Sequence, residues 1–250
     1  MTPVLETRGL GRHFGALEAV ADVSLAVEPG VLHAVIGPNG AGKTTLFHLM
    51  SGLLAPTTGR VLFQGEDVTT LPAPARCRLG ISRTFQITSI FPELSVLENV
   101  RIAVQLKTGG NFRVLGGGAL LKETERCAWE SLQSLGLQPR AAEPAATLPH
   151  GDQRLLEIAM AVAQKPALLL LDEPTQGLSP EDTAATVAVI RRLARAQRLT
   201  IVLVEHDMDV VFGLADRISV LQFGRLIADG SPEAIRADPT VQKAYLGGAE

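Results

Sequence analysis

A lysine and two threonines follow a glycine-rich segment near residue 40, with a spacing that suits phosphate binding. The segment matches G-x-x-x-x-G-K-[ST], follows an apolar run at 31–36 and precedes the apolar periodicity of a helix that begins near Lys43. Glycines let backbone N–H groups converge on phosphate oxygens, and the helix N-terminus adds a favourable field for an anion. The residues predicted to hold phosphates are Gly37, Pro38, Asn39, Gly40, Ala41, Gly42, Lys43, Thr44 and Thr45.

The side chains of this loop predict a nucleoside triphosphate with Mg²⁺. Lys43 supplies a flexible cation for the β- and γ-phosphates, Thr44 a hydroxyl for Mg²⁺, and Thr45 a donor for the α-phosphate. A glycine-rich turn that merely contains a lysine is the alternative, and the strand-loop-helix context argues against it.

Two further apolar runs end in polar residues that fit the same chemistry. Four leucines lead into Asp172 and Glu173, and the run at 200–204 leads into His206. An acid at the end of a buried strand can hold Mg²⁺, and a second carboxylate beside it can activate water. Because ligands of open α/β sheets bind at the carboxyl ends of strands, these groups are predicted to meet the phosphate loop.

The order of apolar and amphipathic segments predicts an α/β fold in one composite domain over residues 1–250. Runs at 31–36, 167–171 and 200–204 suit strands of a parallel sheet buried on both faces. Segments 4–8, 20–27 and 61–63 indicate a more antiparallel layer, and 95–163 is mostly helical. The glycine-rich stretch at 109–118 is predicted to be a loop.

Composition excludes several classes of protein. The chain has 23 basic and 26 acidic residues and a net charge of −3, which does not favour nucleic-acid binding. The cysteines, Cys77 and Cys127, form no CxxC pair and are predicted to be buried reduced thiols. Neither a signal peptide nor an apolar run near the ~18 residues of a membrane span is present, so we expect a soluble chain that stays where it is made.

Taken together, the motifs resemble those of an ATP-binding cassette. The phosphate loop, a glutamine at Gln86, a signature-like segment at 148–153, the pair Asp172 and Glu173, the turn at 174–179 and His206 occur in that order and span nearly the whole chain. The resemblance implies a P-loop NTPase core with a mostly parallel sheet, an N-terminal antiparallel β layer and a helical subdomain inserted at roughly 88–165.

The resemblance also implies roles for individual residues. Phe14 would stack on adenine, and Gln86 would sense Mg²⁺ and the attacking water. Glu173 would act as the general base, and His206 would contact the γ-phosphate. The implied catalytic set is Glu173, His206 and Gln86, and the implied metal set is Thr44, Gln86 and Asp172. The signature-like Pro149, His150, Gly151 and Asp152 would bind the ATP held by an opposite subunit.

Two segments depart from the usual cassette pattern. Pro149, His150 and Asp152 replace the first serine, the first glycine and the glutamine of Leu-Ser-Gly-Gly-Gln, while apolar residues at 155, 158, 159 and 162 still predict a helix. That helix N-terminus can aim N–H groups at a phosphate, and His150 either replaces the lost donor or lies on the surface. Ser179 stands where many cassettes have aspartate; helix capping and subunit contact are both open for it.

The C-terminal stretches at 206–218, 224–232 and 241–247 resemble those of the ATPase subunits of bacterial importers of branched-chain amino acids, and so do the segment at 153–159 and the turn at 176–180. That family also serves other small polar solutes. That resemblance implies transmembrane permeases as partners, a second ATP-binding subunit that is identical or a sister chain, and indirectly a solute-binding protein. It places the chain at the cytoplasmic face of the inner membrane, held there by the permeases.

Three alternatives remain at this point. A lipid or lipopolysaccharide exporter has similar ATPase subunits. A soluble cassette acting on nucleic acid or ribosomes usually carries two cassettes or a long coiled coil, and the chain has one phosphate loop and no sustained heptads. A GTPase or small-molecule kinase is the third; a GTPase needs an Asn-Lys-x-Asp motif, and none of the asparagines, Asn39, Asn99 and Asn111, precedes a lysine.

Overall fold

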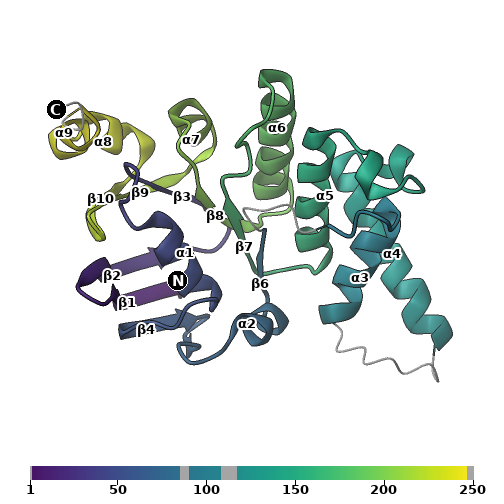
Figure 1. Cartoon of the computed structure of the whole chain (residues 1–250), viewed down its shortest axis with the longest axis horizontal. Helices are drawn as coiled ribbons and strands as arrows, with labels where there is room; N and C mark the ends of the chain where they lie inside the picture. The colour runs from purple at the N-terminus through teal and green to yellow at the C-terminus, as the bar shows by residue number, and fades with distance from the viewer. Residues whose placement is uncertain (1, 85–89, 108–116, 247–250) are drawn as a thin grey trace.

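The computed structural model describes residues 2–84, 90–107 and 117–246, and a mixed, mostly parallel sheet lies at its centre (Figure 1). The strand order is β10-β9-β3-β8-β7-β6, with β9 and β10 antiparallel and the other pairs parallel. Every residue of β3, β7 and β8 is buried, as the apolar runs predict. The strands are β3 (Leu32–Ile36), β6 (Ile81–Arg83), β7 (Leu168–Asp172), β8 (Thr200–Val204), β9 (Arg217–Gln222) and β10 (Arg225–Gly230).

A second, antiparallel sheet has the order β2-β1-β4-β5 and confirms the predicted N-terminal layer. Its strands are β1 (Leu5–Phe14), β2 (Leu17–Val27), β4 (Thr58–Phe63) and β5 (Glu66–Asp67). The sequence predicts a shorter first strand, at 4–8, because Gly11 resembles a residue that ends a strand; β1 in fact continues to Phe14. Instead, Gly11 lies inside the strand, where an added Cβ would come within 2.4 Å of Thr58 Oγ1. The glycine is therefore explained by the close approach of β4.

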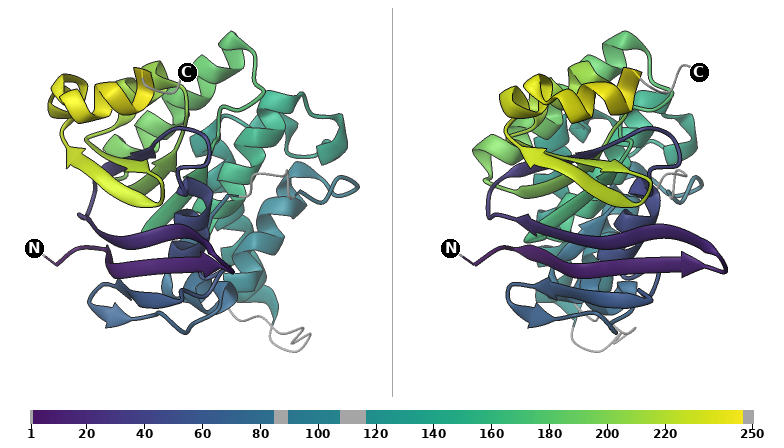
Figure 2. Two further views of the ribbon diagram at one scale, coloured as in Figure 1. Left: turned by 60° about the vertical axis from the view of Figure 1, so that its left-hand side comes forward. Right: turned by 90° about the vertical axis from the view of Figure 1, so that its left-hand side faces the viewer.

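Helices lie against both faces of the central sheet. In Figure 2 the strands β1 and β2 run side by side, and α1 lies behind them. Between β6 and β7 the chain forms α3, α4 and α5, which pack on one another and stand together at one side of Figure 1. The helices are α1 (Lys43–Ser51), α2 (Ala73–Leu79), α3 (Val96–Lys107), α4 (Gly117–Leu135), α5 (His150–Ala163), α6 (Pro180–Ala196), α7 (Met208–Leu214), α8 (Pro232–Ala237) and α9 (Pro239–Leu246), with short 3₁₀ turns at Gln138–Arg140 and Ala145–Thr147.

The core has two parts, one on each face of the central sheet. Alternate residues of a strand enter opposite parts: Leu169 packs with the helical side, whereas Leu168 and Leu170 pack with the antiparallel layer and α1. This alternation follows from the two-residue period of a strand. Burial on both faces fixes the strand ends rigidly, and those ends carry the polar residues of the site.

Some sequence predictions need correction or fall outside the described residues. Cys127 is buried as predicted, but Cys77 is only partly buried, and its thiol donates to Gln164 Oε1 at 2.8 Å; neither cysteine is in a disulfide. Gly117 and Gly118 begin α4 rather than belonging to a loop. The remaining glycines of the predicted loop, at 109, 110 and 116, lie outside the described residues. Among the residues described, no helix has the length and apolar character to cross a membrane.

Candidate functional site

The ends of β3, β7 and β8 lie at one edge of the central sheet, and a pocket of 440 Å³ opens there. β3 leads into the phosphate loop, β7 ends at Asp172, and β8 is followed by Glu205 and His206. The pocket is lined by residues that the sequence singled out and by some that it did not: Phe14, Leu17, Glu18, Ala19, Asn39, Gly40, Ala41, Gly42, Lys43, Thr44, Thr45, Glu173, Phe223 and Gly224.

The glycines of the phosphate loop are required by its backbone. Gly40 and Gly42 have φ of +78° and +98°, in the left-handed region that side chains disfavour. At Gly42 space is also missing, since a Cβ would lie 2.3 Å from the carbonyl oxygen of Ala19. The chain then enters α1 at Lys43, so that the N–H groups of the first helical turn have no carbonyl partner within the helix. They are available for an anion in the pocket.

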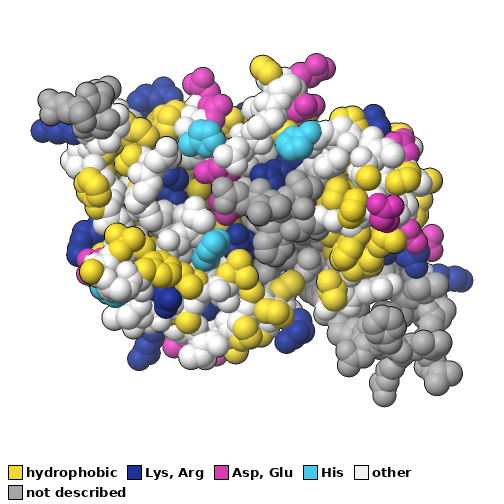
Figure 3. Space-filling view, viewed as in Figure 1, with side chains coloured by type: hydrophobic (Ala, Val, Ile, Leu, Met, Phe, Trp, Pro, Cys, Tyr) yellow, Lys and Arg dark blue, Asp and Glu magenta, His cyan; other side chains and the backbone are white. Residues whose placement is uncertain are grey.

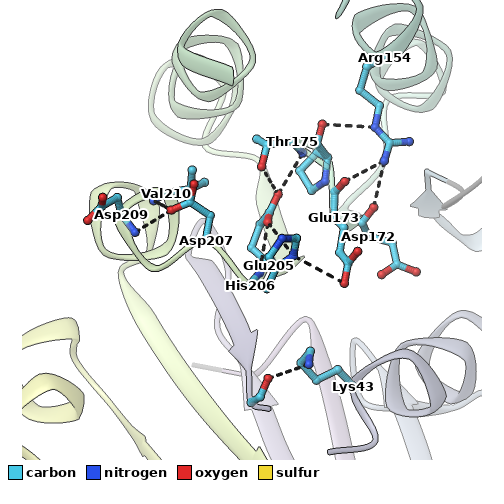
Figure 4. Close-up of polar contacts among 12 residues, drawn as sticks. Lys43, Arg154, Asp172, Glu173, Thr175, Glu205, His206, Asp207, Asp209 and Val210 are labelled. Atoms are coloured by element: carbon cyan, nitrogen blue, oxygen red, sulfur yellow. Dashed lines mark hydrogen bonds and ion pairs between the residues drawn. The ribbon is translucent and has the colours of Figure 1, made fainter. Parts of the chain in front are cut away.

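Lys43 is a buried cation at the base of this pocket. It is 8 % exposed, and its Nζ donates to the carbonyl oxygens of Gly37 at 2.7 Å and Pro38 at 3.0 Å. Burial lowers the pKa of Lys43, while the negative charges of Glu173 and Asp172 oppose that shift. Figure 4 draws Lys43 across from these two carboxylates. The ammonium group is positioned to exchange its two carbonyl partners for phosphate oxygens.

Asp172 is a buried carboxylate at the last residue of β7. Its carboxylate pairs with the guanidinium of Arg83, at 3.5 Å between Nη2 and Oδ2. Burial raises the pKa of Asp172, and Arg83 acts in the opposite direction. A second cation beside Asp172 would stabilise its buried negative charge. Asp172 and the hydroxyl of Thr44 offer the hard oxygen ligands that Mg²⁺ prefers.

Glu173 follows in a conformation that separates its carboxylate from that of Asp172. Its φ is +45°, a left-handed value that a non-glycine residue adopts at a cost of order 1 kcal/mol, and its N–H donates to the carbonyl of Val204 at 2.9 Å. The side chain lines the pocket, with Oε1 3.9 Å from Nδ1 of His206. The structure therefore brings Lys43, Glu173 and His206 to one edge of the sheet.

Glu205 is a residue that sequence reasoning missed. Its side chain is fully buried and accepts hydrogen bonds from the N–H of Thr175 at 3.0 Å and from its hydroxyl at 2.6 Å. The other carboxylate oxygen accepts from the N–H of His206 at 3.2 Å. The sequence pattern that could have indicated Glu205 is an acid that directly follows an apolar run and precedes a histidine. Glu205 ties the turn after β7 to the segment that carries His206.

Two aromatic side chains, Phe14 and Phe223, line the pocket. Phe14 is 46 % exposed, and the guanidinium of Arg12 lies 4.8 Å from its ring centroid. Phe223, in the turn between β9 and β10, lines the same pocket; the sequence analysis did not single it out. Gln86 lies outside the described residues. Within the described ranges, no group of three or more His, Cys, Asp or Glu could hold a metal ion.

The signature-like segment lies at the start of α5, apart from the pocket. The predicted helix is confirmed; it begins at His150 with Pro149 as its N-cap. Gly151 is buried, and a Cβ there would lie 2.7 Å from the carboxylate of Asp182. Asp152 pairs with Arg140 at 2.9 Å, and His150 is exposed. Pro149, His150, Gly151 and Asp152 do not line the pocket that holds Lys43.

Ser179 has the capping role that was one of its two predicted possibilities. Its hydroxyl oxygen accepts from the N–H of Asp182 at 3.1 Å, Pro180 is the first residue of α6, and Glu181 and Asp182 stand in its first turn. These features follow the usual preferences of a helix start.

Comparisons with known proteins identify the family. Residues 20–176 match the family described as ABC transporter, and residues 225–250 match the family described as branched-chain amino acid ATP-binding cassette transporter. The chain is 41% identical to the high-affinity branched-chain amino acid transport ATP-binding protein BraF of Pseudomonas aeruginosa and 42% identical to LivG of Escherichia coli K12, with 99% of each chain covered.

A solved structure extends the likeness to the fold. It is the ADP conformation of an ATP-binding cassette of an ABC transporter, with 28% identity and a TM-score of 0.84, covering 99% of this chain and 100% of the other. These matches agree with the phosphate loop, the buried acid of β7 and the two-sheet architecture. The chain belongs to the ABC transporter family and is one of its ATP-hydrolysing cassettes.

Proposed function

We propose that the chain powers an importer of branched-chain amino acids or a related small polar solute. The full-length relatives are named for branched-chain amino acid transport, and the C-terminal residues match a family of the same description. The observation that carries the ATPase chemistry is the meeting of Lys43 and Glu173 in one pocket. A phosphate-binding cation thus faces a carboxylate that can take a proton.

The reaction follows from this geometry. The N–H groups of the loop and the Nζ of Lys43 hold the β- and γ-phosphates, and Phe14 stacks on the adenine. Thr44 and Asp172, with Gln86, would hold Mg²⁺, which would offset phosphate charge when bound. Glu173 accepts a proton from the water that attacks the γ-phosphorus, and His206 contacts the γ-phosphate. The bond from the γ-phosphorus to the bridging oxygen breaks, and its electron pair leaves with ADP.

A second cassette is part of the proposal. The N-terminus of α5 carries the signature-like residues, yet none of them lines the pocket of their own chain. A helix N-terminus favours a phosphate, so the exposed end of α5 suits an ATP that another subunit holds. Two cassettes, identical or sister chains, would meet head to tail with two ATP molecules between them.

The permease partners would dock on the helical part of the chain, roughly residues 88–165. A groove of 230 Å³ lies between α3 and α5, and its apolar lining includes Phe91, Leu106 and Met160. Leu106 is 70 % exposed and Phe91 is 47 % exposed. Figure 3 shows hydrophobic side chains gathered over this helical region. We propose that an amphipathic cytoplasmic helix of a permease occupies this groove, which would hold the chain at the cytoplasmic face of the inner membrane.

The test is transport by the assembled complex in vesicles. The chain, co-purified with its permeases and solute-binding protein, is expected to take up radiolabelled leucine or a related small solute when ATP is present on the cassette side. Lys43→Ala in the same complex should abolish uptake. Movement of a lipid instead of an amino acid would replace this proposal with the exporter alternative.

A further inference from the structure

Arg154 is a buried arginine that reaches from α5 to the turn carrying Glu173. Its side chain is 7 % exposed. Nη2 donates to the carbonyl oxygen of Glu173 at 2.7 Å, and Nε donates to that of Pro174 at 3.2 Å. Nη1 pairs with Glu157 on the same helix at 2.7 Å. Figure 4 shows the guanidinium lying against this turn.

The same turn is held from its other side by Glu205, through the N–H and hydroxyl of Thr175. Glu173 itself has φ of +45°, which persists only where surrounding contacts enforce it. A guanidinium presents its donors in a rigid fork, so it fixes two successive carbonyls more tightly than an ammonium does. Arg154 thus helps to hold the backbone from which the candidate base projects.

The position of Arg154 along α5 gives these contacts a further consequence. His150, at the exposed start of the helix, and Arg154 are four residues apart and therefore lie on one face, a turn from each other. A displacement of the helix start by a bound phosphate would therefore pass through one helical turn to the guanidinium. From there it reaches the backbone of Glu173.

We propose that Arg154 is a positioning residue that couples the two ATP sites of the dimer. Resting on the proposed two-cassette function, the inference is that α5 senses the γ-phosphate of the partner's ATP and Arg154 transmits this contact to Glu173, which acts on the ATP of its own chain. Hydrolysis at one site then depends on occupancy of the other. The coupling element is a physical chain of contacts: helix start, guanidinium, carbonyl and base.

The first experiment compares ATP binding and turnover of Arg154→Lys in the assembled transporter. Lysine keeps the charge beside Glu157 but cannot hold both carbonyls. We expect kcat to fall about 10- to 100-fold, while the Kd for ATP changes less than threefold because the phosphate loop is untouched. Arg191→Lys is the matched control, since Arg191 is an exposed arginine whose Nη2 donates to a single carbonyl, that of Gly213, at 3.0 Å; it should change neither quantity by more than twofold.

A double-variant cycle separates positioning from a general structural effect. If Arg154 acts through the Glu173 carboxylate, Arg154→Lys should lower turnover less than threefold in a Glu173→Gln background. The inference is overturned if turnover of the double variant falls by the product of the two single-variant losses. It is also overturned if Arg154→Lys lowers ATP affinity as much as it lowers kcat. A wild-type complex that binds ATP but never hydrolyses it would rule out the proposed function itself. If the wild type is active and the two losses multiply in the double variant, only the role of Arg154 is ruled out.

Discussion

The phosphate loop at 37–45 and the signature-like segment at 148–153 both lead into helix N-termini, but their glycines serve different physical needs. Gly40 and Gly42 take left-handed backbone angles, and the loop they form lines a pocket with Lys43. Gly151 has an ordinary helical backbone, but the carboxylate of Asp182 leaves no space for a side chain there. The first site is thus built by backbone conformation, and the second by the close packing of α5 against α6.

This difference explains why a cassette can change one segment and keep the other. A proline, a histidine and an aspartate at 149, 150 and 152 leave the start of α5 in place, because the helix supplies N–H groups whatever the side chains are. In the phosphate loop a side chain at Gly42 would collide with backbone that has no room to move. Loss of function is therefore expected to be steeper in the loop than in the signature-like segment.

The largest effect on ATP binding is expected for Lys43→Ala. No other flexible cation lines the described pocket, so the β- and γ-phosphates lose their only side-chain cation there. We expect ATP affinity to fall at least about 100-fold, or ~2.7 kcal/mol. Isothermal titration with Mg-ATP measures it, and Lys165→Ala, which changes an exposed lysine, is the control. Unchanged affinity in Lys43→Ala would break the assignment of the loop.

An intermediate effect is expected from adding a methyl group at each kind of glycine. Gly42→Ala should weaken ATP binding at least about tenfold, or ~1.4 kcal/mol, because both the φ angle and the Ala19 carbonyl oppose it. Gly151→Ala should instead lower the free energy of unfolding by about 1–3 kcal/mol through overpacking. Asp182→Ala should recover part of that loss, since the clash is with the Asp182 side chain.

Urea denaturation of the wild type, the two single variants and the double variant at 151 and 182 checks this interpretation. Additive losses at the two positions would show that Gly151 is not kept for packing.

The smallest effect is expected for Pro149→Ser, which restores the usual cassette residue. If the backbone N–H groups of α5 carry most of the phosphate binding, ATP turnover in the assembled transporter should change less than about tenfold, or ~1.4 kcal/mol. A gain of 100-fold would mean that the serine hydroxyl, rather than the helix start, determines affinity at this half of the site.

Much of the site was predictable because its residues directly follow apolar runs in the sequence. The loop at 37–45, the acids after β7 and His206 all follow apolar runs whose burial the sequence shows directly. The contacts of Arg154 were not predictable in this way, because its partners are backbone carbonyls of a turn that comes from a different part of the chain. The length of β1 was missed because a glycine needed for close packing looks, in sequence, like one that ends a strand.

The central claim is that Glu173 takes the proton from water at an ATP held between two cassettes. Glu173→Gln tests it most directly, by gel filtration with and without ATP and by steady-state turnover. We predict a variant that binds ATP as the wild type does, hydrolyses it about 10²–10⁴-fold more slowly, and elutes as an ATP-dependent dimer. Turnover at the wild-type rate, or a variant that with ATP bound stays monomeric both alone and when mixed with its sister cassette, would contradict the account.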